Sequence, residues 1–291
     1  MLEDLKNLFK GNNFIGQIIL ICASVFLVEN IVSNISPGTG MQITRWFAMH
    51  SYLPSVLTSP WSLFTYMFLH GSFQHLFWNM IMFYWFARIV NDFMGKQRLV
   101  GLYFLGGISG ALFYLIVYSL QVLGGETVID TPLVGASAGI MAVVALAGFR
   151  FGDYQMNLLL IGPVRLRYVA LGIFVMNTVL DFSMNTGGKL SHLGGAAFGY
   201  FYFRTLNQGK DYAFDFSNFL NKIPKLFQRK PKIRIVKNNT TSYQSRPTGH
   251  SSSQAEDQKR MDAILDKISK SGYDNLSKDE KAFLFKMSNK N

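Results

Sequence analysis

Four polar side chains, His75, Asn79, Ser137 and His192, lie in three separate apolar stretches and have the chemistry of acyl transfer. An imidazole beside a serine takes the hydroxyl proton and later gives it to the leaving group, which makes the serine a nucleophile. His75 and Asn79 are four residues apart, so a helix places them on one face, and both can donate hydrogen bonds to a common point. Two such donors stabilise the oxyanion of a tetrahedral intermediate. The pattern predicts a dyad of Ser137 and His192, with an oxyanion hole that includes His75 and Asn79.

Small residues near Ser137 and His192 predict that the two segments pack closely. Ser137 lies within the segment Gly135-Ala-Ser-Ala-Gly139, which lets other backbone approach closely. Gly195 and Gly199 follow His192 with the spacing typical of closely packed membrane helices. If the two segments pack together, His192 comes near Ser137. The sequence places no carboxylate to orient His192, which favours a dyad over a triad.

Each of these features alone also has a structural interpretation. Small residues in membrane helices usually serve packing, and Asn79 alone could simply bond to a neighbouring helix. A metal site made of His70, His75 and His192 is poorly spaced, and the chain has one cysteine and no HExxH pattern. We therefore expect no metal and no cofactor. The catalytic interpretation rests on the combination of residues.

The composition indicates an integral membrane protein. Charged residues make up 15% of the 291 residues, although the net charge is +11, and soluble proteins average about 25%. This disfavours a soluble domain, a disordered chain and a nucleic-acid-binding domain. A membrane-spanning helix needs about 20 mostly apolar residues. Windows without charge predict an all-α protein with six spans, at residues 14–33, 71–90, 99–119, 135–150, 166–184 and 190–206.

Two regions between the spans call for particular interpretations. Residues 37–60 contain Pro54 and Pro60 and many aromatic side chains. We interpret them as an interfacial loop, and two tightly turned spans are the alternative. The span at 135–150 is short for a membrane, so its start lies below the outer surface. Part of the loop 120–134 must then dip inward, which is tolerated only where backbone is buried in protein or lines water.

The distribution of lysine and arginine predicts the orientation. Cations flank the N-terminal side of the first span and follow the second, fourth and sixth spans, whereas the alternate loops contain only Arg45 and Lys189. Short cytoplasmic loops carry the excess of cations, so both termini are expected in the cytoplasm. The first span lacks a small-residue cleavage site, so we expect it to be a membrane span rather than a cleaved signal peptide. The predicted location is the cell (inner) membrane of a bacterium, with the four polar groups in the outer leaflet.

The chain divides into four predicted parts: a cytoplasmic N-terminus at 1–13, a six-span domain at 14–206, a basic flexible linker at 207–254 and a small helical segment at 255–291. Residues 207–291 carry most of the positive excess, and the linker's cations could contact anionic lipids. Ser277 and Glu280 have the spacing of a capping box, which predicts a short helical hairpin in the last segment.

At three motifs the sequence resembles the rhomboid family of intramembrane serine proteases, over residues of about 10 to 206. The motifs are His70-Gly-Ser-Phe-Gln-His75-Leu-Phe-Trp-Asn79, Gly135-Ala-Ser137 and His192-Leu-Gly-Gly195-Ala-Ala-Phe-Gly199. The resemblance implies that Ser137 is the nucleophile and His192 its base, and that His75, Asn79 and the Ser137 amide form the oxyanion hole. It also implies that His70 organises the first loop, and that the fifth span with the loop near 184–190 admits the substrate. Ala138, Met141 and Ser62 depart from the residues often found in the family.

The sequence leaves two other functions open. A catalytically silent binder or chaperone of membrane proteins could share the fold, although such a relative would be expected to lack Ser137 or His192. A solute transporter would show inverted repeats and charged groups at the midplane, and we find neither. The expected substrates are single-span membrane proteins, cut in the outer part of the membrane at a residue with a small side chain.

Overall fold

The computed structural model describes residues 13–127, 130–158, 161–180, 186–227 and 251–288. It separates two units, residues 1–229 and residues 230–291. Residues 1–12 of the predicted N-terminal segment and residues 228–250 of the predicted linker therefore lie outside the described residues.

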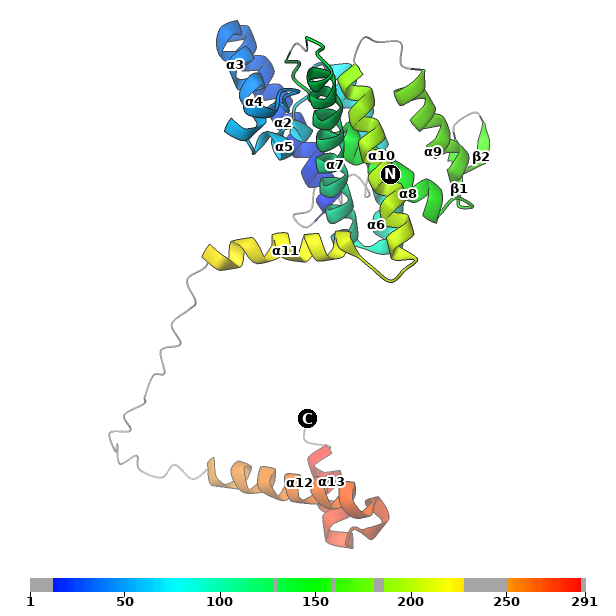
Figure 1. The fold of residues 1–291 in the computed structure, drawn as a ribbon. Helices are drawn as coiled ribbons and strands as arrows, with labels where there is room; N and C mark the ends of the chain where they lie inside the picture. Colours follow the sequence, from blue (N-terminus) through cyan, green and yellow to red (C-terminus); the bar gives the residue numbers. More distant parts are fainter. Residues whose placement is uncertain (1–12, 128–129, 159–160, 181–185, 228–250, 289–291) are drawn as a thin grey trace, which may run out of the picture. The chain divides into compact units, whose positions relative to one another are not determined.

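The long helices of the first unit occur where the six spans are predicted (Figure 1). They are α2 (Phe14–Ile35), α6 (Phe73–Met94), α7 (Lys96–Leu123), α8 (Ser137–Arg150), α9 (Leu166–Phe174) and α10 (Thr186–Leu206). Among the described residues, α2 and α7 are long and apolar enough to cross a membrane. The helices α8 and α9 are apolar but shorter. Helix α6 carries His75, and α10 carries His192 and five glycines. Two spans are therefore clear, and the other four stay predictions.

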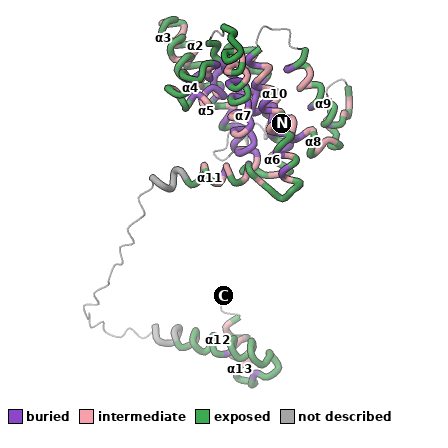
Figure 2. Tube along the Cα trace, viewed as in Figure 1, coloured by how far each residue is buried: buried purple, intermediate pink, exposed green. Residues whose placement is uncertain are grey.

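Helix α8 forms the centre of this unit. Ten of its 14 residues are buried, and its neighbours α7 and α10 also turn many residues inward (Figure 2). A helix of 14 residues is only about 21 Å long. Because protein surrounds α8, its N-terminal end can lie inside the unit and still be shielded from lipid.

Residues 37–68 are more helical than the predicted interfacial loop. They form α3 (Pro37–Phe47), α4 (Leu53–Thr58), α5 (Ser62–Thr65) and the 3₁₀ turn η1 (Tyr66–Phe68). The longest of these has 11 residues, about 16 Å, so residues 37–68 contain no second full-length helix, which the alternative of two tightly turned spans would need. Trp61 stacks on Trp46, with ring centres 5.4 Å apart, and donates a hydrogen bond to its carbonyl.

The segment before α8 turns into the unit, as predicted from the short span at 135–150. Leu133 and Met49 exchange two backbone hydrogen bonds of 2.7 and 3.0 Å. The Gly135 amide then donates to the Tyr66 carbonyl over 3.0 Å, and Leu133 is buried. Nearer the surface, the Asp130 carboxylate lies 2.8 Å from His50 Nδ1 and accepts hydrogen bonds from the Ser51 amide and hydroxyl. The chain before α8 is thus bonded to the first loop along its length.

A β-hairpin between α8 and α9 corrects the all-α expectation. Its strands are β1 (Gln155–Leu158) and β2 (Gly162–Arg165), paired antiparallel. Exposed and half-buried residues alternate along both strands, which is the period of a strand rather than a helix. Gly162 opens β2 with a φ of 88°, a conformation that favours glycine. The apolar composition of this loop concealed the alternation.

Helix α11 (Tyr212–Phe227) lies across one end of the first unit and packs on α7 (Figure 1). These residues are expected to belong to a flexible linker at 207–254, but for residues 212–227 the structure shows a helix instead. Asp211 holds the helix: it accepts hydrogen bonds from Arg98 (2.6 Å), Tyr202 (2.5 Å) and the Phe214 amide (3.1 Å). Burial raises the pKa of the Asp211 carboxyl, but these hydrogen bonds outweigh it and leave the pKa below its ordinary value.

The second unit contains the expected short helical pair, α12 (Ser251–Ser271) and α13 (Lys278–Ser288), joined by the 3₁₀ turn η3 (Tyr273–Asn275). The capping box is formed: the Ser277 amide donates to Glu280, and the Glu280 amide donates to the Ser277 hydroxyl. Lys267 pairs with Glu280 at 2.9 Å, and Ile264 and Leu276 are buried.

The hydrogen bonds of Asp211 predict a pH-dependent contribution to stability. Asp211→Asn should lower the free energy of unfolding by about 1–3 kcal/mol at pH 7, because the charged acceptor of three donors is lost. A carboxyl whose folded pKa is depressed stabilises above its unfolded pKa, about 3.9, and loses this effect as the pH falls through the folded pKa. The difference in melting temperature between wild type and variant in detergent should therefore be full at pH 7 and shrink below about pH 4.

Asp92→Asn is the matched control, because Asp92 forms an exposed pair with Arg88 at 3.9 Å. It should change stability by less than about 1 kcal/mol. Equal losses in both variants, or a difference for Asp211→Asn that does not vary with pH, would contradict this role.

Candidate active site

Ser137 is the first residue of α8 and is 9% exposed. Gly135, two residues earlier, has a φ of 132°, which a residue with a side chain rarely adopts. This turn redirects the chain from the inward loop into α8 and leaves the serine at the helix N-terminus. The amides of a helix's first turn have no acceptor within the helix, so the Ser137 amide is a donor at the site.

The structure brings His192 to the serine. Nε2 of His192 lies 2.8 Å from the Ser137 hydroxyl oxygen, although the two residues are 55 apart in sequence. This distance follows from how closely α10 packs on α8. A Cβ on Gly195 would overlap the Ala138 carbonyl oxygen, and one on Gly199 would overlap the Ala142 carbonyl oxygen. Only hydrogen at both positions allows the two backbones to touch.

The other nitrogen of His192 has a partner that the sequence did not reveal. Nδ1 lies 3.0 Å from the backbone carbonyl oxygen of Asn177. A carbonyl only accepts hydrogen bonds, so Nδ1 carries the proton and Nε2 is left as an acceptor for the serine hydroxyl. Asn177 lies in a π-helical turn, Val175–Val179, that follows α9. Such turns are frequent at functional sites. Every residue type has a backbone carbonyl, so the sequence gives no signal for this contact. The π turn that presents the carbonyl is visible in the structure.

His75 borders the serine from α6. A Cβ on Gly135 would lie 2.9 Å from Cε1 and 3.0 Å from Nε2 of His75, and 3.6 Å from the Ser137 hydroxyl. The imidazole therefore covers Gly135 on the serine's side. Any side chain at this position would separate His75 from the serine.

Asn79 lies one turn after His75 on α6 and is 2% exposed. Its amide nitrogen donates to the His75 carbonyl over 3.0 Å, while its buried Oδ1 has no hydrogen-bond partner. The second hydrogen of the amide nitrogen is not used by that bond. The structure places Asn79 beside His75 but gives no direct contact between Asn79 and Ser137.

His70 lies just before α6 and is 3% exposed, and neither of its ring nitrogens has a hydrogen-bond partner. Its ring lies against that of His75, with centres 5.2 Å apart. Buried polar atoms without partners are costly and concentrate at functional sites. His70, His75 and Asn79 thus form one polar cluster inside the unit. The described residues hold no group of three His, Cys, Asp or Glu side chains that could bind a metal.

Comparison with known proteins shows which family the chain resembles. A family model described as a rhomboid domain matches residues 57–208, just over half of the chain. RHOMBOID-like protein 12, mitochondrial, of Arabidopsis thaliana is 32% identical over 148 residues, which are 47% of this chain and 43% of that protein. Rhomboid protease GlpG of Klebsiella pneumoniae is 26% identical over 123 residues, 36% of this chain and 42% of that protein.

A third relative matches more of the chain. Presenilin-associated rhomboid-like protein, mitochondrial, of Bos taurus is 25% identical over 208 residues, 68% of this chain and 49% of that protein. The chain thus spans less than half the length of each of these relatives. A separate model, a family of unknown function (DUF6576), matches residues 250–290, the helical pair of the second unit.

The contact between α8 and α10 predicts the effect of a single methyl group. Gly195→Ala should separate the two backbones and lower the free energy of unfolding by about 1–3 kcal/mol, the usual cost of overpacking. Gly172→Ala in α9 is the matched control, since a Cβ there has nothing within 4 Å. It should be neutral or stabilise by up to about 1 kcal/mol through helix propensity. Thermal unfolding in mild detergent compares them, and equal stability of the two variants would refute the close contact.

Proposed function

The chain belongs to the rhomboid family of membrane proteins, and from this premise we propose that it is an intramembrane serine endopeptidase that acts through Ser137 and His192. One observation carries the proposal: a serine at a helix N-terminus lies 2.8 Å from an imidazole whose other nitrogen is held by a carbonyl. Hydrogen-bonded nucleophile, base and orienting group are the three parts of an activated serine.

Acylation begins when the Ser137 oxygen attacks the carbonyl carbon of the scissile peptide bond. The hydroxyl proton passes to Nε2 of His192, and the imidazolium keeps its Nδ1 hydrogen bond to the Asn177 carbonyl. A neutral carbonyl stabilises this cation less than a buried carboxylate does, but it fixes the same tautomer. The proton then moves from Nε2 to the leaving nitrogen as the peptide bond breaks.

The oxyanion of the tetrahedral intermediate needs donors that are already in place. We assign this role to the Ser137 amide, the His75 imidazole and the Asn79 amide group. The amide has no acceptor in its helix, and the N-terminal end of α8 adds a favourable dipole. His75 lies against Gly135, and Asn79 retains one hydrogen after bonding to the His75 carbonyl. Each such donor contributes about 3–4 kcal/mol where one has been removed.

Deacylation repeats these steps with water. His192 takes a proton from a water molecule, the water oxygen attacks the ester carbon, and the proton returns to the Ser137 oxygen as the ester bond breaks. This requires water within a membrane protein. The partnerless nitrogens of His70 and the free Oδ1 of Asn79 favour water at the cluster, because buried polar atoms normally find a partner. His70 is therefore proposed as a positioning residue for that water and for the first loop.

We further propose single-span membrane proteins as substrates, cut in the outer part of their span at a residue with a small side chain. The proposed orientation has six spans with both termini in the cytoplasm of a bacterial cell, and it rests on the lysine and arginine distribution. Two of the relatives carry the word mitochondrial in their names, so an organelle membrane is the alternative location. The serine is expected to lie in the half of the membrane away from α11.

Replacement of the serine is the direct test. Purified Ser137→Ala, reconstituted in liposomes with a single-span reporter, should show no cleavage, because no other group replaces the nucleophile. Ser191→Ala is the matched control: Ser191 is a buried serine next to His192, and its hydroxyl bonds to the Gly188 carbonyl of its own helix. That variant should retain cleavage. Cleavage by Ser137→Ala at the wild-type rate would refute the nucleophile, whereas no cleavage by folded wild type with any reporter would favour a binder.

Two asparagines separate the proposed side-chain and backbone roles. Asn79→Ala should lower kcat about 10²–10³-fold with little change in KM, since its donor acts on the transition state. Asn177→Ala should leave kcat within about threefold of wild type, because its amide group bonds to the Ile173 carbonyl and the carbonyl facing His192 belongs to the backbone. Similar kcat values for both variants would exclude Asn79 from the oxyanion hole.

A further inference from the structure

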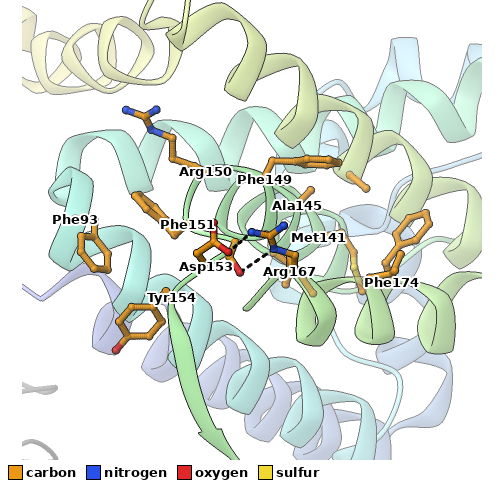
Figure 3. Close-up of a pocket in the computed structure, with 16 residues that line it drawn as sticks. Phe93, Met141, Ala145, Phe149, Arg150, Phe151, Asp153, Tyr154, Arg167 and Phe174 are labelled. Carbon is orange, nitrogen blue, oxygen red and sulfur yellow. Dashed lines mark hydrogen bonds and ion pairs between the residues drawn. The ribbon is translucent and has the colours of Figure 1, made fainter. Parts of the chain in front are cut away.

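A cavity of about 820 Å³ lies along α8 from Met141 to the C-terminal end of the helix. Ser137 lies at the opposite, N-terminal end of the same helix. The cavity is bounded by α8 and α9, by the end of α6 and by the turn after α8 (Figure 3). Its volume falls in the range of small-molecule sites, about 300–1,000 Å³. The proposed proteolytic function does not use it.

The body of the cavity is apolar. Small residues, Ala145, Gly148 and Ala170, leave room between α8 and α9. Aromatic side chains line two sides: Phe93 and Tyr154 on one, and Phe174 on the other, beside Met141 (Figure 3). Phe93 stacks on Phe151 with ring centres 4.8 Å apart, which gives that side a fixed wall. An apolar chain would fill such a space.

The polar rim of the cavity is cationic. Arg150 and Arg167 line it, and Arg165 lies 3.7 Å from the same carboxylate, Asp153, that pairs with Arg167. Figure 3 shows Arg167 and Asp153 facing one another beside Phe151, with Arg150 at the outer side. Three cations against one anion leave an excess of two positive charges. The side chains of Arg165, Arg167 and Asp153 are 56%, 43% and 76% exposed, so the rim is open to a headgroup.

We propose that this cavity binds one anionic phospholipid, with an acyl chain between α8 and α9 and the phosphate at Arg150 and Arg167. Guanidinium groups bind phosphate oxygens in a bidentate way, and basic pockets between membrane helices are known to hold anionic headgroups. The span of a protein substrate fits the charge less well, because the cytoplasmic flanks of spans are usually lysine- and arginine-rich. Two like charges would then meet at the rim.

The position of this lipid connects it to the catalytic helix. Met141, at the inner end of the cavity, lies one turn after Ser137 on α8. Leu171 and Phe174 of α9, also at the cavity, precede the π turn that presents the Asn177 carbonyl. The lipid would therefore contact both helices that orient the dyad, away from the reacting atoms.

Native mass spectrometry of the full chain tests the proposal. The protein in detergent is mixed with equal amounts of phosphatidylglycerol and phosphatidylcholine of the same acyl chains, and the bound lipid is counted. Wild type should retain one phosphatidylglycerol in preference to phosphatidylcholine. Arg150→Gln and Arg167→Gln should each lower this preference about fivefold, the effect of one basic residue near an anionic lipid. Asp153→Asn should raise it, because the competing carboxylate charge is lost.

Arg88→Gln is the matched control, since Arg88 is an exposed arginine of α6 that pairs with Asp92 outside the cavity. It should keep the wild-type preference. Equal retention of both lipids by wild type, or the same loss in Arg88→Gln as in Arg150→Gln, would overturn the site and indicate general attraction of lipid to a basic protein. If an arginine variant folds poorly, Asp153→Asn still tests the site, because it should bind phosphatidylglycerol with a greater preference than wild type does. Binding is measured without a substrate, so failure here leaves the proposed protease intact.

Discussion

The contact between the backbones of α8 and α10 is the constraint on which the site depends. Gly195 and Gly199 bring α10 onto the carbonyl oxygens of Ala138 and Ala142, and this sets the 2.8 Å distance between His192 and Ser137. Lipid tails are as apolar as leucine, so helices in a membrane associate through close packing and hydrogen bonds rather than through the hydrophobic effect. The close contact at these glycines therefore bears both on stability and on the geometry of the Ser137–His192 pair, and a methyl group at this contact would affect both.

A second requirement is that polar groups be kept inside an apolar environment. Helix α8 begins within the protein, and its preceding loop is bonded to the first loop through Leu133 and Asp130. The cluster of His70, His75 and Asn79 lies beside Gly135, just before this helix. Several of these buried atoms lack partners, which is unfavourable for folding. In the proposed reaction, the same arrangement would supply donors to an oxyanion and polar partners to water. Three of the six buried side-chain atoms without a partner among the described residues belong to His70 and Asn79, at the site of the proposed reaction.

The sequence predicts the parts of this arrangement that depend on side-chain type. Charge-free windows locate the long helices to within a few residues. Of the four predicted side chains, the structure brings His192 to Ser137, places His75 beside Gly135 and places Asn79 next to His75. The Asn177 carbonyl is missed, because every residue has a carbonyl. The β-hairpin at 155–165 and the helix α11 are missed for a different reason. Apolar and amphipathic segments adopt structure according to what they pack against, and α11 depends on the contact of Asp211 with Arg98, 113 residues earlier.

In the proposed enzyme, the packing of α10 on α8 activates Ser137 through His192. The most direct measurement is the rate at which a fluorophosphonate labels the protein in detergent, with the modified residue located by peptide mass spectrometry. We expect a single label on Ser137 in the wild type and a rate at least 100-fold lower in folded His192→Ala, because a serine without its base is a weak nucleophile (about 10²–10⁴-fold for general-base catalysis). A label elsewhere, no label on folded wild type, or an equal rate in His192→Ala would contradict it.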